Sequence, residues 1–189
     1  MKLGISQFAA ALREIRPDEF GPARINPMLE SLDLIPSSVE RYVKFRPGSY
    51  TRNLVYANPE FELMVLCWDA GAVSSIHDHM GQQCWFVAHS GSFQVENYDL
   101  LAGGREPGYA RVGATTVDSN VTVGMPDYRA PDFNELHRVS VPAGGARAIS
   151  IHVYAKPLSH CLVFNDREQR CMEKPMAYDN VTIERILVA

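Results

Sequence analysis

The 189-residue sequence lacks several features that would assign it to well-known classes of protein. No apolar stretch approaches the ~20 residues that a membrane-spanning helix needs. The first sixteen residues include Arg13, Glu14 and Arg16, so they lack the apolar core of a secretion signal. We therefore expect a cytoplasmic protein without a membrane partner.

A strong excess of charge of one sign is also missing. The chain has 18 basic and 22 acidic residues, a net charge of −4, and no run of like charges. Because proteins that bind nucleic acids usually carry a basic patch, this balance argues against a nucleic-acid partner.

The length predicts one domain spanning residues 1–189, large enough to bury a core without disulfides. Nothing in the sequence specifies an assembly, and our expectation is a monomer.

Cysteine is scarce, and its spacing excludes two kinds of site. No pair forms a CxxC motif, so the sequence contains neither a zinc ribbon nor a thioredoxin-like redox motif. Without a secretion signal, the thiols are expected to be reduced and mostly buried. The four residues are Cys67, Cys84, Cys161 and Cys171.

Residues 1–45 are predicted to form short helices, on the spacing of their apolar side chains. Ser6, Asn26 and Ser38 are the expected N-caps of three helices, with Pro27 in the first turn of the second. We expect this helical segment to pack outside the rest of the chain.

From residue 46 onward the sequence consists of short β-rich runs separated by glycine, proline and Asn-Asp clusters. Many short strands at regular spacing indicate a sandwich or a closed barrel. The prediction is therefore a mostly β protein with a small barrel over residues 46–189, ending in the strand VTIERILV. The polar stretch from Met125 to Glu135 is predicted to be a loop.

The first candidate for chemistry is the sequence His77-Asp78-His79. On a strand, alternate side chains share a face, so both imidazoles would point one way and Asp78 the other. Two neutral imidazoles on one element make half of a divalent-metal site. The pattern alone is weak, because two ordinary surface histidines produce it as often.

The residues around the two histidines extend the pattern to a longer motif. Gly71, Cys84 and Gly91 complete the run G-x5-H-x-H-x4-C-x6-G, which resembles the first motif of the cupin barrels, except that Cys84 replaces their usual glutamate. His137 is the natural candidate for the histidine of the second cupin motif. The resemblance implies a jelly-roll barrel holding a metal.

Three histidines without a ligand carboxylate leave a bound metal with its full positive charge. Such a site favours an anionic ligand that arrives with the substrate, such as a thiolate, and it keeps positions open. Open sites of this general type hold iron in oxygenases, but three histidines and a water also describe a catalytic zinc. The spacing does not choose between these metals.

Five segments together resemble the cysteine dioxygenase family, over roughly residues 45–166. They are Tyr50-Thr51-Arg52-Asn53-Leu54-Val55, Leu66-Cys67-Trp68, Ser74-Ser75-Ile76-His77-Asp78-His79 with Cys84, His137-Arg138-Val139, and Ser150-Ile151-His152-Val153-Tyr154.

This resemblance implies a role for each site residue. It makes His77, His79 and His137 the ligands of Fe(II). Arg52 would pair with the substrate carboxylate, for which its planar fork is suited, with the Tyr50 hydroxyl nearby. Tyr154 would lie beside the iron, joined to Cys84 by a thioether and oriented by Ser150 and His152. A surface position on an edge strand is the competing interpretation of Arg52.

The predicted function is oxidation of L-cysteine by dioxygen to cysteine sulfinic acid. One alternative keeps the chemistry but acts on another thiol, such as 3-mercaptopropionate, cysteamine or a bulkier one, because the stretch 125–135 looks longer than in the family. The other alternative is a cupin that binds a small acid or sugar with zinc or nickel and performs no oxidation.

Overall fold

The computed structural model describes residues 2–132 and 134–180, and its helices all lie before residue 43. Two of them have nine residues, α1 (Ile5–Arg13) and α2 (Pro22–Glu30). Shorter turns of helix are η1 (Pro17–Glu19), α3 (Pro36–Val39) and η2 (Glu40–Tyr42). No helix within the described ranges is long and apolar enough to cross a bilayer.

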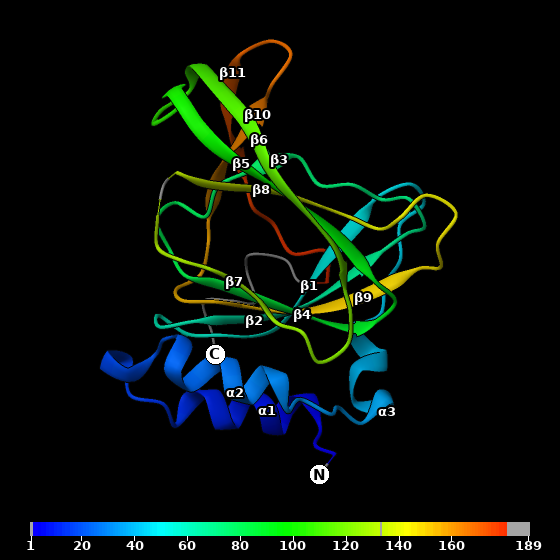
Figure 1. Ribbon diagram of the computed structural model, residues 1–189. Coiled ribbons are helices and arrows are strands. Elements are labelled where there is room, and N and C mark those ends of the chain that lie inside the picture. Colours follow the sequence, from blue (N-terminus) through cyan, green and yellow to red (C-terminus); the bar gives the residue numbers. More distant parts are fainter. Residues whose placement is uncertain (1, 133, 181–189) are drawn as a thin grey trace.

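Strands make up most of the remaining chain and form two sheets that face each other (Figure 1). One sheet has the order β1-β2-β9-β4-β7, and the other closes in the order β10-β11-β6-β5-β8-β3. The strands are β1 (Tyr50–Ala57), β2 (Glu62–Trp68), β3 (Ile76–His77), β4 (Cys84–Ser90), β5 (Phe93–Gly103), β6 (Gly108–Val121), β7 (Asp127–Arg129), β8 (Glu135–Ser140), β9 (Ala148–Tyr154), β10 (His160–Asn165) and β11 (Arg170–Pro175).

The helices cover the outer face of the five-stranded sheet, on the side away from the second sheet (Figure 1). Strand β2 shows the result, because all seven of its residues are buried. Its alternate residues Leu63 and Val65 pack with the helices, whereas Met64 and Leu66 pack between the sheets. The predicted mostly β architecture with helices packed outside is confirmed.

The expected helix caps were wrong in detail. Helix α1 has Gly4 as its N-cap, two residues before Ser6, which lies inside the helix. Helix α2 already begins at Pro22, so Pro27 lies inside it, and Asn26 accepts a hydrogen bond from the Trp85 indole instead of capping. Tertiary packing explains this difference, because the Asn26 side chain ties the helix to β4.

Ser38 also serves a different helix from the one predicted. The third helix begins at Pro36, and the Ser38 hydroxyl accepts a hydrogen bond from the Ile5 backbone N–H, 3.0 Å away, at the start of α1. The stretch 125–135 is likewise only partly a loop, because Asp127–Arg129 pairs with β4 as strand β7. The predicted strand VTIERILV lies outside the described residues.

Candidate active site

Three histidines converge between the two sheets, although the strand that carries the first one is shorter than predicted. β3 ends at His77, which lies directly opposite His137 of β8, and His79 follows two residues later. The Nε2 atoms of His77 and His137 are 3.2 Å apart. Asp78 turns the other way, as predicted, and its carboxylate accepts the Leu162 N–H at 2.8 Å.

The geometry and protonation of this cluster fit a metal ion. The candidate ligand atoms of His77, His79 and His137 all lie within 4.8 Å of one another. Burial lowers the pKa of His77 to about 4 and the pKa values of His79 and His137 well below their ordinary range, so all three rings are neutral. The buried Nε2 of His79 has no hydrogen-bond partner among the described residues. Neutral imidazoles are the form that binds metals, so the cluster can hold one.

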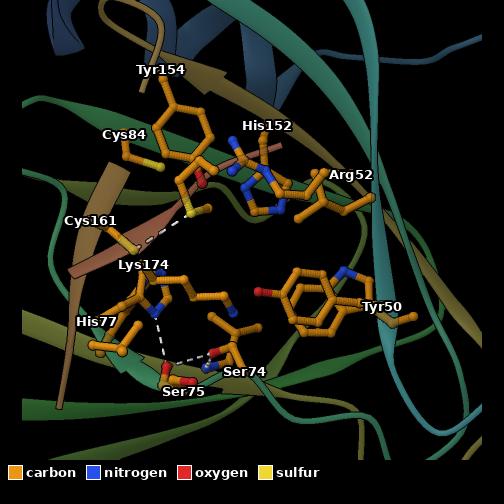
Figure 2. Close-up of a pocket in the computed structure, with 16 residues that line it drawn as sticks. Tyr50, Arg52, Ser74, Ser75, His77, Cys84, His152, Tyr154, Cys161 and Lys174 are labelled. Carbon is orange, nitrogen blue, oxygen red and sulfur yellow. Dashed lines mark hydrogen bonds between the residues drawn. The ribbon is translucent and has the colours of Figure 1, made fainter. Parts of the chain in front are cut away.

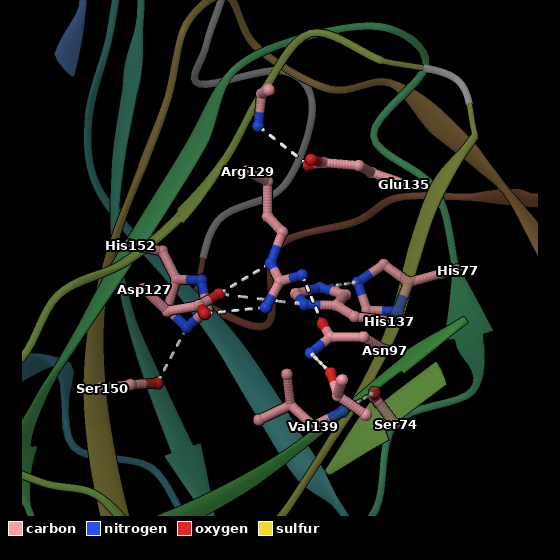
Figure 3. A network of polar contacts seen from close by, with 12 residues as sticks. Ser74, His77, Asn97, Asp127, Arg129, Glu135, His137, Val139, Ser150 and His152 are labelled. Atoms are coloured by element: carbon pink, nitrogen blue, oxygen red, sulfur yellow. Dashed lines mark hydrogen bonds and ion pairs between the residues drawn. The ribbon is translucent and has the colours of Figure 1, made fainter. Parts of the chain in front are cut away.

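A polar network lies behind His137, on β7 (Figure 3). The Arg129 guanidinium donates two hydrogen bonds to the Asp127 carboxylate, at 2.7 and 2.8 Å, and a third to the Asn97 side chain at 2.5 Å. The Asp127 carboxylate in turn lies 3.9 Å from Nδ1 of His137. This separation is longer than a hydrogen bond, and Nδ1 of His137 has no hydrogen-bond partner among the described residues, so the carboxylate acts on the ring through its charge. Sequence reasoning missed this network because it assigned the stretch to a loop.

Arg52 lies on β1, in the sheet opposite the one that carries His77 and His137. Its side chain is buried and only 5% exposed. The competing interpretation of a surface arginine is therefore wrong. Its Nη2 lies 3.3 Å from the Glu62 carboxylate, whereas its Nε and Nη1 have no hydrogen-bond partner among the described residues. Glu62 also accepts a hydrogen bond from the Tyr178 hydroxyl. Burial raises the pKa of Glu62, and the Arg52 charge opposes that rise.

Strand β9 presents Ser150, His152 and Tyr154 on one face, as their spacing predicts. The Ser150 hydroxyl accepts the Trp68 indole N–H at 2.9 Å, which leaves its proton for His152 Nε2 at 2.8 Å. Burial lowers the pKa of His152 to about 3 and raises the pKa of Tyr154 well above its ordinary value. The imidazole is therefore neutral and the phenol protonated.

Tyr154 of β9 lies close to both His79 and Cys84. Its ring centroid lies 6.0 Å from that of His79, across the space between the sheets. Cys84 of β4 is its direct cross-strand partner. Burial raises the pKa of the Cys84 thiol, although a hydrogen bond with Tyr154 opposes the rise. All four cysteines are free and buried, as predicted.

One pocket lies between the two sheets (Figure 2). All predicted site residues line it except His79 and Ser150. Tyr50 forms part of this lining and stacks on Trp68 with ring centroids 4.4 Å apart. The pocket also includes Lys174 of β11, to which sequence reasoning assigned no role.

Comparison with known proteins identifies one family. A family profile described as "Cysteine dioxygenase type I" matches residues 5–167. Cysteine dioxygenase type 1 of Danio rerio is 30% identical over 151 residues, which cover 79% of this chain and 73% of that protein. The Homo sapiens protein of the same name is 29% identical over 151 residues, covering 79% of this chain and 72% of its own length.

Solved structures show more distant similarity. A Thermus thermophilus protein is 16% identical with a TM-score of 0.45, over 62% of this chain and 93% of that one. A Klebsiella pneumoniae protein with a double-stranded beta-helix domain is also 16% identical, with a TM-score of 0.46, over 67% and 94% of the two chains. The closed barrel and the family match confirm the predicted cupin fold. The chain belongs to the cysteine dioxygenase type I family of oxygenases.

Proposed function

We propose that the protein is an iron-dependent thiol dioxygenase that oxidises L-cysteine with O2 to cysteine sulfinic acid. The observation that carries this proposal is the pairing of two features across one pocket. Three neutral histidines without a ligand carboxylate face a buried arginine that keeps two nitrogens unpaired among the described residues. The first feature suits a thiolate and the second suits a carboxylate, and cysteine carries both groups.

His77, His79 and His137 would hold Fe(II). The iron, when bound, supplies the redox chemistry with dioxygen and the coordination positions for the substrate. The protein would orient His77 through the Ser75 backbone carbonyl, which lies 2.9 Å from Nδ1 of His77, while the Asp127 carboxylate lies 3.9 Å from Nδ1 of His137. The contact with Ser75 leaves Nε2 of His77 facing the cluster.

Arg52 would bind the substrate carboxylate through one of its unpaired nitrogens, Nε or Nη1. These nitrogens are buried without a partner on different edges of the guanidinium plane, so an incoming carboxylate would satisfy the one that faces it. The pairing of Nη2 with Glu62 holds the guanidinium plane in one orientation before the substrate arrives. Positioning of this kind converts binding energy into correct alignment of the thiol.

Tyr154 would provide a protonated phenol near the reacting atoms. The hydrogen-bond series from Trp68 through Ser150 to His152 fixes the neighbouring imidazole, whose ring stacks nearly parallel to that of Tyr154 at 6.0 Å between centroids. A thioether to Cys84 would hold the phenol in a single position.

Oxygen uptake on iron-loaded protein tests the function. The product should be cysteine sulfinic acid, and isotope-labelled O2 should supply both of its added oxygen atoms. One O2 should be consumed per cysteine without an added reductant. The stoichiometry balances because the sulfur supplies all four electrons. Zinc-loaded protein is the matched control and should consume no oxygen. If the iron-loaded protein binds cysteine but consumes no oxygen, the alternative of a non-oxidative cupin replaces this proposal.

A further inference from the structure

The pocket lining contains two cationic side chains, Arg52 and Lys174, and no carboxylate. They come from opposite sheets, since Arg52 is on β1 and Lys174 is on β11. Figure 2 shows them on opposite sides of the central space, with the Lys174 side chain extending from beside His77 toward Tyr50. The pocket therefore has a positive group on each side of the position where a thiol would reach the histidines.

The strand register explains why Lys174, although exposed to solvent, reaches the edge of the pocket. Lys174 lies directly opposite Cys161 on β10, and cross-strand partners share a face of the sheet. Cys161 is buried and lines the same pocket. The preceding residue, Glu173, pairs instead with Leu162, which belongs to a hydrophobic cluster on the other face.

The two cations differ in their partners. The charge of Arg52 is already matched by the fully buried Glu62. Within residues 2–132 and 134–180, Lys174 has no carboxylate within ion-pair distance. Burial and the Asp78 carboxylate raise the pKa of the Cys161 thiol to about 11, and the charges of Lys174 and Arg52 both act to lower it. Both cations therefore act on the same space, and only Lys174 lacks a compensating anion of the protein.

We propose that Lys174 binds a second carboxylate of the substrate, so that the pocket prefers a small thiol with two carboxylates over a thiol with one. This inference rests on the proposed thiol oxidation, and it ranks a thiol with two carboxylates above L-cysteine as the preferred substrate. One carboxylate would pair with Arg52 and the other with Lys174, while the sulfur lies between them at the histidines. An ammonium group suits the second position, because it binds as a point charge without the fixed geometry of an arginine.

Steady-state oxygen uptake with mercaptosuccinate and 3-mercaptopropionate tests the preference. These thiols differ in the number of carboxylates, and the quantity to compare is the ratio of their kcat/KM values. We expect the ratio to favour mercaptosuccinate, and Lys174→Met to lower it about tenfold, mainly through KM, which corresponds to one lost ion-paired contact. Lys174→Arg should restore most of the ratio. Lys2→Met removes one positive charge from the helical side of the molecule and should leave the ratio unchanged.

Calorimetry of thiol binding to zinc-loaded protein separates this inference from the proposed function, because it needs no turnover. The same preference and the same loss in Lys174→Met are expected there. Absence of oxygen uptake with every thiol would contradict the oxidation but not the binding preference. An unchanged ratio in Lys174→Met, or an equal loss for both thiols, would overturn the role of Lys174.

Discussion

Cys84 and Tyr154 lie directly opposite each other on the neighbouring strands β4 and β9. Directly opposed residues of antiparallel strands have Cβ atoms only about 4.5–5.5 Å apart and point to the same face. We therefore predict that a thioether joins the two side chains after turnover with iron and oxygen. Peptide mass spectrometry should show one crosslinked peptide that has lost two hydrogen atoms.

Matched variants identify the sulfur that forms this bond. Cys84→Ser should abolish the crosslinked peptide, whereas Cys161→Ser, which removes the other pocket thiol, should retain it. Recovery of only unmodified Cys84 and Tyr154 peptides after many turnovers would contradict the prediction.

Loss of one histidine of the cluster should remove the metal. We expect purified protein reconstituted with Fe(II) to hold one iron per chain, and His137→Ala to hold far less, because the remaining two imidazoles no longer enclose the ion. His160→Ala removes a histidine outside the cluster and should keep the full content. Elemental analysis measures both variants, and equal iron content in the two would exclude the assignment of His137.

Asp127 should act on metal affinity through His137. Asp127→Asn keeps the size of the side chain but removes the charge beside Nδ1 of His137 and one partner of Arg129. Loss of a carboxylate that is hydrogen-bonded to a ligand typically weakens metal binding by about 10- to 100-fold. Because Asp127 lies 3.9 Å from Nδ1 of His137, we expect a loss of about tenfold. Competition with a chelator measures the affinity. Asp132→Asn, in the exposed part of the same segment, is the control, and an equal effect of the two substitutions would argue against a specific role.

Arg52→Lys should weaken binding of thiols that carry a carboxylate. The lysine keeps a positive charge beside Glu62 but loses the planar fork, so we expect KM for cysteine to rise about tenfold. The KM of cysteamine, which has no carboxylate, is the internal comparison. If both constants rise equally, Arg52 supports the pocket without recognising the carboxylate. Arg52→Ala is less informative, because it leaves Glu62 buried without its ion partner.

The pair of Glu96 and Arg138 should stabilise the strand that carries His137 in a pH-dependent way. A hydrogen bond from Tyr98 and the pairing with Arg138 lower the pKa of Glu96 in the folded state. A lowered folded pKa gives stability that is present above the unfolded pKa and is lost as the pH falls through the folded value. Glu96→Gln should therefore cost about 1 kcal/mol at pH 7, a modest figure because the pair is partly solvent-screened.

Urea unfolding at pH 7 and at progressively lower pH checks this prediction, with the difference between the proteins shrinking below about pH 4. Glu173→Gln makes the same charge change at an exposed position and should show little difference at any pH. A Glu96→Gln cost that stays constant with pH would show that the ion pair is not its source.

The sequence contained enough information to pick out the three histidines that converge and the three residues of β9 that share a face. Alternation along β9 aligns Ser150 with His152, because successive side chains of extended backbone point to opposite faces. The same alternation predicted that His77 and His79 share a side, although β3 ends at His77. These relationships are local, so they do not depend on how the strands are arranged. The roles of Arg52 and Cys84, by contrast, came from resemblance to a family.

Several features of the site depend on contacts that no local pattern contains. Glu62 reaches Arg52 across the β1–β2 pair, and Asp127 reaches His137 only because part of the predicted loop pairs with β4 as β7. Lys174 is one charged residue among many in the sequence, and its register with Cys161 alone brings it to the edge of the pocket. The sequence by itself determined which side chains can bind a metal and share a strand face. Only the tertiary structure decided which charges meet across the pocket, because strand pairing brings together residues that are far apart along the chain.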